Sequence, residues 1–317
     1  MVVPNLFSVV VVTYNQEKFV IDTLQSVLNQ TYPAIELIVS DDASKDRTLR
    51  LVENWIQKHR DRFQRVEILS SPTNQGVPAN YNRGVKATRG EFIKCIGGDD
   101  ILLPDALEKV SRFFTKEPNA LVCVSLIEPF GDLGPFRQVR TIPDKKWYFL
   151  FKNDARIQFR ALSSHCFLPG PSLFFKRDIF NKHGFFDERL RRFEDWPFLL
   201  KITSEGTKLH LLPEITVKWR IHSDSISNSA LVKSDEAFFR DQLLVYKLYV
   251  SPRTGFLSFW EKYHVHIQMA YLEGLIRRGS NLRAHKEARF IKLLDPLWWK
   301  DFPLYIHTKL FKVFRLV

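Results

Sequence analysis

The sequence predicts an α/β fold with an open, mostly parallel sheet flanked by helices and a helical extension at the C-terminus. Three observations predict it. β-branched runs alternate with helical patterns over about the first 130 residues, their spacing is typical of right-handed crossovers, and the chain beyond about residue 230 has a helical pattern. The 317 residues, 45% of them hydrophobic, suffice for one large or two ordinary domains.

The elements of the first half follow from residue patterns. Phe7–Thr13 is a continuous β-branched run, as in a buried parallel strand. Lys18–Asn29 places apolar residues at helical spacing. Ser44 is the expected N-cap of the second helix, and Pro104 is expected in the first turn of the fourth. The other expected elements are strands at 35–40, 66–70, 91–96 and 120–127, and helices at 47–59, 78–87 and 104–115.

The pattern changes twice along the chain. From about residue 130 it becomes irregular, because glycines and prolines interrupt it, and beyond about residue 230 it is helical. We therefore expect one domain over 1–229, with a change near 130, followed by a basic, mainly helical region over 230–317. That last region holds fifteen Lys and Arg and eight Asp and Glu, so it carries seven of the twelve net positive charges.

Composition argues against several classes of protein. The apolar content excludes disorder, and the longest uncharged apolar stretches, such as 6–14 and 121–127, are shorter than the ~20 residues of a membrane span. The three cysteines have no metal-site spacing, which fits a reducing compartment. The net charge of +12 suits an anionic partner, but aromatic residues do not interleave with the basic ones, so nucleic acid is not expected. We expect a cytoplasmic protein.

Pairs of acidic residues follow two predicted strands, at the sheet edge where such folds bind ligands. Asp41 and Asp42 end the second strand, and Asp99 and Asp100 follow a later strand after two glycines. Adjacent carboxylates are costly to bury without partners, but they can hold a hard divalent cation together with water and diphosphate oxygens. Either pair alone could also cap a helix; their position at one edge favours a ligand site.

Several motifs together resemble the GT-A-fold, family 2 inverting glycosyltransferases. Each motif is weak, but they follow the family's order and spacing over residues 7–225. They are Val12-Thr13-Tyr14-Asn15, the run from Val39 to Thr48, Asn74-Gln75-Gly76, Gly90-Glu91-Phe92-Ile93, the run from Gly98 to Pro104, Gly184-Phe185-Phe186-Asp187-Glu188, Glu194-Asp195-Trp196 and Trp219-Arg220-Ile221-His222-Ser223.

The resemblance implies transfer of a sugar from a nucleotide-sugar, most often a UDP-sugar, to a hydroxyl of a saccharide or lipid-linked acceptor, as in bacterial surface polysaccharide synthesis. Residues 1–130 would bind the donor, and 131–229 would hold the acceptor and the catalytic part. By motif position, Asp42 would bind the base and Asp195 would be the catalytic base. The implied residues are Thr13, Tyr14, Asn15, Asp42, Asn82, Asp99 and Arg220 for the donor, Asp99, Asp100 and His222 for Mn²⁺ or Mg²⁺, and Asp195 with Glu194 for catalysis.

The chemistry of the reaction asks for the same groups. A leaving diphosphate needs a neutralising cation, and an acceptor hydroxyl needs a general base. An acidic residue far from the metal pair in sequence meets the second need, although Glu194-Asp195 also fits a solvated helix N-terminus. Two positions depart from the family pattern: Gly97 stands where many members are acidic, and Tyr81 stands where a basic residue often precedes Asn82. The Leu168–Ser172 segment either shapes the acceptor pocket or is a simple turn.

The last residues, 298–317, are expected to form a basic amphipathic helix. Ile306, Leu310 and Val317 would share one face, and Lys309 and Lys312 the opposite one. Such a helix can lie in the plane of an anionic membrane surface, which would make the protein peripheral on the inner face of the cytoplasmic membrane. The alternative is a terminal helix docked on the core.

Two other functions remain open at this point. A metal-dependent nucleotidyltransferase also places carboxylates at the edge of an α/β sheet, but its glycine-rich basic first loop is not found after Phe7–Thr13. Neither GxGxxG after a strand nor GxxxxGK[ST] occurs, which weakens dinucleotide and P-loop interpretations. A non-catalytic membrane-surface binding protein is the second alternative, and the intact acidic motifs argue against it.

Overall fold

We analysed a computed structural model, which describes residues 2–133, 139–164, 166–223 and 236–277. The chain divides into two compact units, Met1–Leu162 with Cys166–Asn228, and Ser163–His165 with Ser229–Val317. The expected membrane-surface helix at 298–317 lies outside the described residues. No helix that the structure describes has the length and hydropathy of a membrane-spanning segment.

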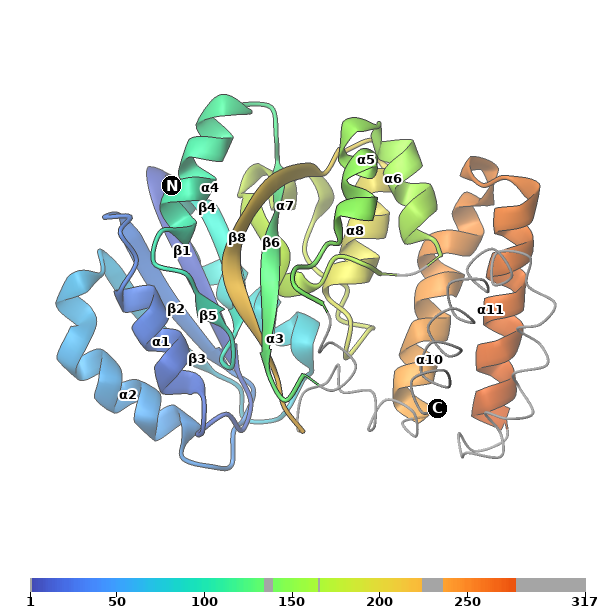
Figure 1. The fold of residues 1–317 in the computed structure, drawn as a ribbon. Coiled ribbons are helices and arrows are strands. Elements are labelled where there is room, and N and C mark those ends of the chain that lie inside the picture. The colour runs from blue at the N-terminus through green and yellow to red at the C-terminus, as the bar shows by residue number, and fades with distance from the viewer. Residues whose placement is uncertain (1, 134–138, 165, 224–235, 278–317) are drawn as a thin grey trace, which may run out of the picture. The chain divides into compact units, whose positions relative to one another are not determined.

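The first unit is built on one mixed sheet (Figure 1). Within the described residues the strand order is β3-β2-β1-β4-β7-β6-β8-β5. The first four strands in that order run parallel to one another. This parallel half matches the predicted alternation of strands and helices. Its strands are β1 (Val3–Thr13), β2 (Ile35–Asp41), β3 (Arg65–Ser70) and β4 (Gly90–Gly97).

The second half of the sheet differs from the prediction. β6 (Val122–Gly131) does not extend the parallel series, because the short β7 (Leu173–Lys176) lies between it and β4 and is antiparallel to both. β8 (His210–Ile221) runs parallel to β6, and β5 (Ile101–Leu102) pairs antiparallel with β8. Strands of two and four residues carry too little pattern to be found in the sequence.

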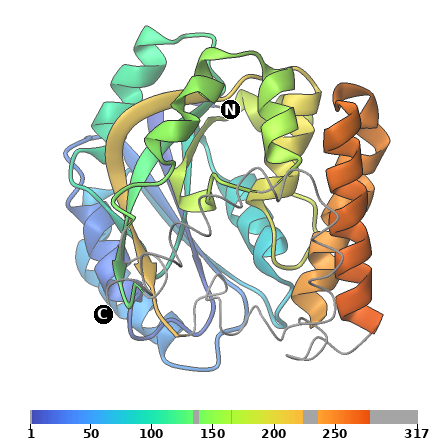
Figure 2. The ribbon, with the colours of Figure 1, turned by 45° about the vertical axis from the view of Figure 1, so that its right-hand side comes forward.

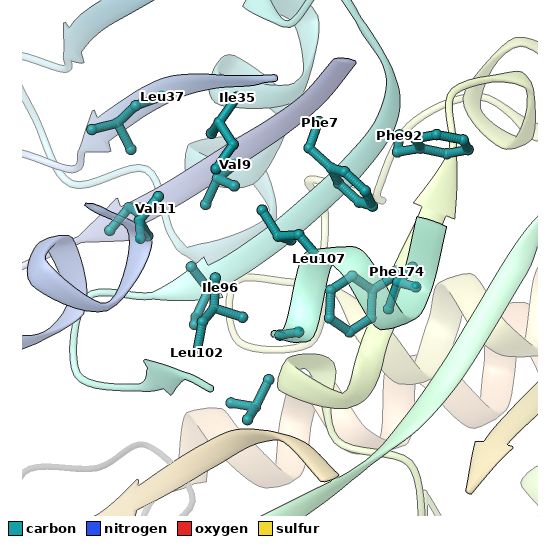
Figure 3. Packing of buried hydrophobic residues seen from close by; sticks show 14 of the residues in the cluster. Phe7, Val9, Val11, Ile35, Leu37, Phe92, Ile96, Leu102, Leu107 and Phe174 are labelled. Carbon is teal, nitrogen blue, oxygen red and sulfur yellow. The ribbon is translucent and has the colours of Figure 1, made fainter. Parts of the chain in front are cut away.

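Helices cover both faces of the parallel strands (Figures 1 and 2). Helices α1 (Val20–Leu28), α2 (Thr48–His59) and α4 (Ala106–Lys116) contribute to one apolar cluster with alternate residues of β1. Figure 3 shows part of this cluster, including Val9 and Val11 of β1 and Leu107 of α4. Helix α3 (Val77–Ala87) packs on the opposite face, where a Cβ on Gly84 would lie only 2.4 Å from Val10 Cγ1. Each large apolar side chain buried in this way contributes about 1.5–3 kcal/mol.

Two helix starts differ from the sequence prediction. Ser44 does not cap α2; its hydroxyl donates to Asp41, while Asp46 Oδ1 accepts from Thr48 N (2.9 Å) at the helix start. Pro104 precedes α4 rather than forming its first turn, since the helix begins at Ala106. An aspartate lies close to each start: Asp46 two residues before α2, and Asp105 directly before α4.

Of the remaining helices of the first unit, η1 (Arg60–Arg62) precedes β3 in the parallel half, and the others lie between the strands of the mixed half. These others are η3 (Lys145–Trp147), α5 (Tyr148–Lys152), α6 (Ala155–Leu162), η4 (Gly170–Ser172), α7 (Asp178–His183) and α8 (Asp195–Ser204). Helix α8 buries most of its length, and Phe198 on it packs against Phe175 of β7 with ring centroids 5.9 Å apart. That packing fixes the start of α8 relative to the sheet.

The second unit is helical over its described residues beyond 235, as the sequence predicts. Helix α10 (Glu236–Val245) is followed directly by η5 (Tyr246–Val250) and η6 (Ser251–Phe256), and then by α11 (Phe259–Arg277). Helices α10 and α11 pack against each other. Buried apolar residues on both helices, such as Leu243 and Leu272, form this contact's core.

Candidate active site

The carboxyl ends of three parallel strands meet at one edge of the sheet. Asp42 N donates to Thr13 O (2.9 Å), which joins the end of β2 to the end of β1. Gly98 N donates to Val12 O (2.9 Å), which joins the loop after β4 to β1. The acidic residues after β2 and β4 are therefore carried to the same edge, where open α/β sheets bind ligands.

Residues at the end of β1 hold the neighbouring loops. Thr13 Oγ1 donates to Asp41 Oδ1 (2.7 Å), and Asp41 also accepts from Ser44 N (2.8 Å). Asn15, with φ of 52°, accepts from Lys45 N (2.7 Å) through its side chain. Thr13 and Asp41 are buried, whereas the side chain of Tyr14 is 46% exposed. Tyr14 is thus the residue of this motif whose ring is open to a ligand.

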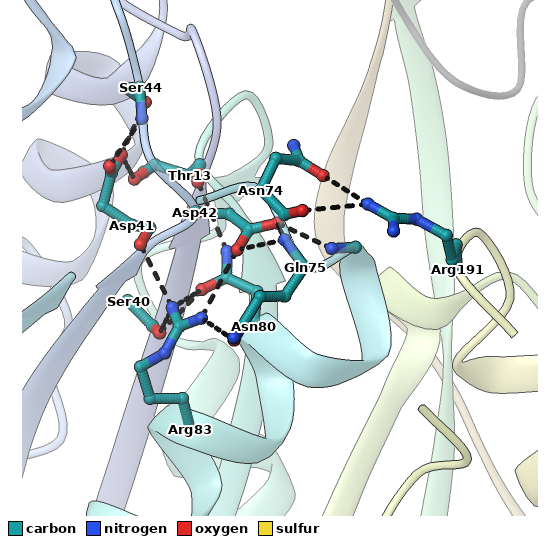
Figure 4. Close-up of polar contacts among 11 residues, drawn as sticks. Thr13, Ser40, Asp41, Asp42, Ser44, Asn74, Gln75, Asn80, Arg83 and Arg191 are labelled. Atoms are coloured by element: carbon teal, nitrogen blue, oxygen red, sulfur yellow. Dashed lines mark hydrogen bonds and ion pairs between the residues drawn. The ribbon is translucent and has the colours of Figure 1, made fainter. Parts of the chain in front are cut away.

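Asp42 is buried and holds the loop before α3 (Figure 4). Its carboxylate accepts from Gln75 N (3.0 Å) and Gly76 N (2.8 Å), and pairs with Arg83 Nη2 (3.3 Å). Gly76 has a φ of 97°, which favours glycine at this turn. Arg83 was not anticipated from the sequence. It could have been noticed because Tyr81 stands where the family often has a basic residue, and Arg83 supplies one two positions later in α3.

Asn82 has a different place from the other expected donor residues. Its side chain is buried in contacts with the segment after α7: Nδ2 donates to Phe186 O (2.9 Å) and Glu188 Oε1 (2.8 Å), and Oδ1 accepts from Phe186 N (3.0 Å). These bonds use all the polar atoms of the amide. Through these bonds Asn82 joins α3 to the loop that leads to Glu194.

The end of β8 places a cation and an imidazole against the second acidic pair. Arg220 N donates to Asp100 Oδ1 (2.9 Å) and Arg220 Nε to Asp99 O (2.8 Å). His222 Nε2 lies 3.1 Å from Asp99 Oδ2. Burial and the negative charge of Asp99 raise the pKa of Asp100 well above its usual range. Residues far apart in sequence are thus gathered around two carboxylates.

This cluster fits a divalent cation that also binds a ligand. Within the described ranges, no three His, Cys, Asp or Glu side chains are arranged as a complete metal site. A cation taking its other ligands from diphosphate and water needs fewer protein atoms, and it would relieve the repulsion between Asp99 and Asp100. Gln16 Oε1 is also buried without a hydrogen-bond partner in the part of the chain that is described, and it lies against Gly98.

The Glu194-Asp195 pair stands at the start of α8. Asp195 Oδ2 accepts from Gly170 N (2.9 Å), and Oδ1 from Trp196 N (2.6 Å). Burial raises the pKa of Asp195, although these two amides lower it in part. Burial and the charge of Asp195 raise the pKa of Glu194 well above its usual range. Carboxylates with raised pKa values are suited to accept a proton near neutral pH.

Tyr81, one of the two positions that depart from the family pattern, is buried in α3. Burial of its side chain is the main cause that raises the pKa of its phenol. The negative charges of Glu194, Cys95, Asp100 and Asp99 raise that pKa further.

Hydrogen bonds join the Glu194-Asp195 pair to β4, the strand that leads to Asp99 and Asp100: Lys94 of β4 donates to Pro171 O, and Gly170 N donates to Asp195 Oδ2.

Comparisons with known proteins bear on the family and the fold of this chain. A sequence model of the family described as "Glycosyl transferase family 2" matches residues 8–184. An uncharacterized glycosyltransferase of Haemophilus influenzae is 37% identical over 128 residues, which are 40% of this chain and 49% of that protein, so the match spans about half of that relative. The poly(ribitol-phosphate) beta-N-acetylglucosaminyltransferase TarS of Staphylococcus aureus is 26% identical over 243 residues, 75% of this chain and 39% of TarS.

Solved structures share the fold. The crystal structure of TarS residues 1–349 in complex with UDP-GlcNAc superposes with a TM-score of 0.61 at 18% identity, covering 94% of this chain and 92% of that one. The mannosyltransferase PcManGT of Pyrobaculum calidifontis, in complex with GDP-Man and Mn²⁺, gives a TM-score of 0.53 at 16% identity, covering 92% and 84%. The sheet described above is thus the GT-A fold. With a family match over more than half of its length, this chain belongs to glycosyl transferase family 2.

Proposed function

We propose that this protein is a metal-dependent, inverting glycosyltransferase that moves a sugar from a UDP-sugar to a hydroxyl group of a saccharide or lipid-linked acceptor. The observation that carries the proposal is the sheet edge at which backbone hydrogen bonds join Asp42 and the Gly98 loop to β1, with Arg220 and His222 against Asp100 and Asp99. The Asp99-Asp100 pair suits a cation with a diphosphate, and the Glu194-Asp195 pair suits a proton acceptor. The TarS structure with UDP-GlcNAc supports the same class of donor.

Asp195 is the proposed general base. It would take the proton of the acceptor hydroxyl while that oxygen attacks the anomeric carbon from the side opposite the leaving diphosphate, which inverts the configuration there. Its raised pKa and its fixed position on Gly170 N and Trp196 N support this role. Burial and the charge of Asp195 raise the pKa of Glu194 well above its usual range, so Glu194 would be the carboxyl of the pair that holds a proton, and Asp195 the charged base.

The nucleotide is proposed to lie along the carboxyl ends of β1, β2 and β4. Asp42 would accept a hydrogen bond from the base, and the exposed Tyr14 would line the pocket. Asp99, with Asp100 and His222 beside it, would hold Mn²⁺ or Mg²⁺, whose charge neutralises the leaving diphosphate. Arg220 would hold the acid pair in place through Asp99 O and Asp100 Oδ1.

A thermal-shift experiment with nucleoside diphosphates tests donor and metal together. We expect UDP to raise the Tm only when Mn²⁺ is present, by an amount equivalent to about 2.7 kcal/mol at a ligand concentration 100 times Kd. ADP and GDP serve as controls, and Asp99→Asn should abolish the Mn²⁺-dependent part. A Tm that no diphosphate changes, or turnover that releases pyrophosphate, would contradict the proposal and favour a binding protein or a nucleotidyltransferase respectively.

A further inference from the structure

The turn at Pro169–Ser172 lies directly against the Glu194-Asp195 pair. Gly170 N donates to Asp195 Oδ2 (2.9 Å), and a Cβ on Gly170 would lie only 2.7 Å from Glu194 Oε1. The position of this backbone therefore sets the position of the proposed base. A side chain at this position would displace the carboxyl group of Glu194.

A fully buried lysine on the neighbouring strand holds this turn. Lys94, in the middle of β4, donates from Nζ to Pro171 O (2.5 Å) and Leu173 O (3.2 Å). Its ammonium also lies 4.2 Å from the ring centroid of Phe174. An ammonium is costly to bury, and burial lowers the pKa of Lys94 to about 7. Packing alone would favour an apolar residue here, so the lysine indicates a requirement for its donors.

Other side chains hold the remaining carbonyl groups of the turn. Ser125 Oγ, from β6, donates to Ser172 O (3.2 Å). Ser172 Oγ donates to Pro169 O (2.8 Å). The turn is thus fixed by buried side-chain donors on its inner side, and it presents the Gly170 amide to Asp195 on the other.

We propose that Lys94 is a positioning residue for the catalytic reaction. Through Pro171 O and Leu173 O it fixes the 169–172 turn, and through Gly170 N it fixes the Asp195 carboxylate. The proposal rests on the proposed function, in which Asp195 is the base. It also assigns the turn, which the sequence left between an acceptor pocket and a simple connection, to the support of that base.

The Gly170 hydrogen bond gives a readout that a merely structural lysine would not affect. This bond lowers the pKa of Asp195, so a displaced turn raises that pKa and moves the acid limb of the kcat/KM profile to higher pH. The other groups that face Asp195 are Glu194, the Trp196 amide and the Cys166 thiol, whose pKa the charge of Asp195 helps to raise. Within the described residues, none of these three groups is among those that interact with the charge of Lys94, which are Cys95, Asp100 and Cys123.

The test compares Lys94→Met with Lys176→Met in the full chain. Lys176 on β7 is the matched control, because its Nζ also donates to a backbone carbonyl, Pro118 O (2.6 Å), and lies near an aromatic ring, Phe114. For Lys94→Met we expect kcat to fall about 10- to 100-fold, KM for the UDP-sugar to stay within about twofold, and the acid limb to move to higher pH. Lys176→Met should retain wild-type values of all three.

Each other result has a fixed meaning. A folded Lys94→Met protein with wild-type kcat and pH profile overturns the proposal. If Lys94→Met does not fold, as judged by circular dichroism and UDP binding, Lys94→Gln replaces it, because its shorter amide cannot reach both carbonyls, and an unchanged acid limb in that variant overturns the proposal. Asp195→Asn is measured in parallel: turnover equal to wild type there would remove the proposed base itself, whereas an inactive Asp195→Asn with a normal Lys94→Met removes only the positioning role.

Discussion

Two buried carboxylates at opposite ends of the parallel strands, Glu36 and Asp100, have different surroundings. At the amino ends, Glu36 of β2 is fully buried and accepts from Ser8 Oγ (2.5 Å), Gly90 N (2.9 Å) and Arg65 Nη1 (3.0 Å). At the carboxyl ends, Asp100 lies beside Asp99, and its pKa is raised. A carboxylate matched by donors stabilises the fold, whereas adjacent carboxylates store repulsion that a bound cation or proton can relieve.

Asp195→Asn gives the largest effect expected from this comparison. The amide keeps the shape of the side chain but cannot take the acceptor proton, so kcat should fall about 10²- to 10⁴-fold while the Kd for UDP stays unchanged. Steady-state transfer rates and UDP titration measure the two quantities. Asp178→Asn is the control, because Asp178 is also the first residue of a helix, α7, but is exposed. Equal losses in the two variants would contradict a role for Asp195 in catalysis.

Glu36→Ala should lower the stability of the fold and leave the catalytic rate unchanged. Removing one partner of a buried, hydrogen-bonded ion pair costs about 3–5 kcal/mol, because Arg65 and three other donors lose their acceptor. Urea unfolding measures the loss, and the kcat of the folded fraction should equal that of wild type. The exposed Glu53 on α2 is the control, since Glu53→Ala should change the stability by less than about 0.5 kcal/mol. A stable Glu36→Ala protein would remove the contrast between the two ends.

The sequence predicts the parallel half of the sheet and the edge that carries the site. Phe7–Thr13 and its successors have long runs of β-branched residues, and strand ends follow from where those runs stop. The acidic pairs could be placed for the same reason. The mixed half could not be predicted, because β7 is four residues long and its neighbours are fixed by contacts across the fold.

The groups that hold the site residues in place could not be predicted from the sequence, for a related reason. Asp42 is held by the backbone amides of Gln75 and Gly76, and Asp195 by that of Gly170. A backbone amide has no letter in the sequence, so residue patterns do not show it. Lys94 was hidden because a lysine within a strand ordinarily indicates an exposed edge, whereas here it is fully buried.

Asp42→Asn should change donor binding and leave the chemical step intact. An amide cannot accept equally well from Gln75 N, Gly76 N and Arg83, so the loop before α3 loosens and the proposed base contact weakens. One hydrogen bond to a charged group contributes about 1.5–3 kcal/mol, which corresponds to a rise of at least about tenfold in KM for the UDP-sugar. The kcat at saturating donor should stay near wild type. A large fall in kcat at constant KM would place Asp42 in the catalytic step instead.

Glu194→Gln gives the smallest effect and the sharpest test of stored repulsion. Because burial and Asp195 raise the pKa of Glu194 above its ordinary value of 4.5, the charged form opposes folding at neutral pH. The neutral amide should therefore raise the free energy of unfolding at pH 7 by about 0.5–2 kcal/mol. As the pH falls through the raised pKa, wild type takes up a proton in the folded state, so the difference should shrink and vanish below about pH 4.5. Glu36→Gln, measured in the same buffers, should instead destabilise the protein at pH 7; a loss of stability in both variants would mean that the acidic pair is as well matched as Glu36.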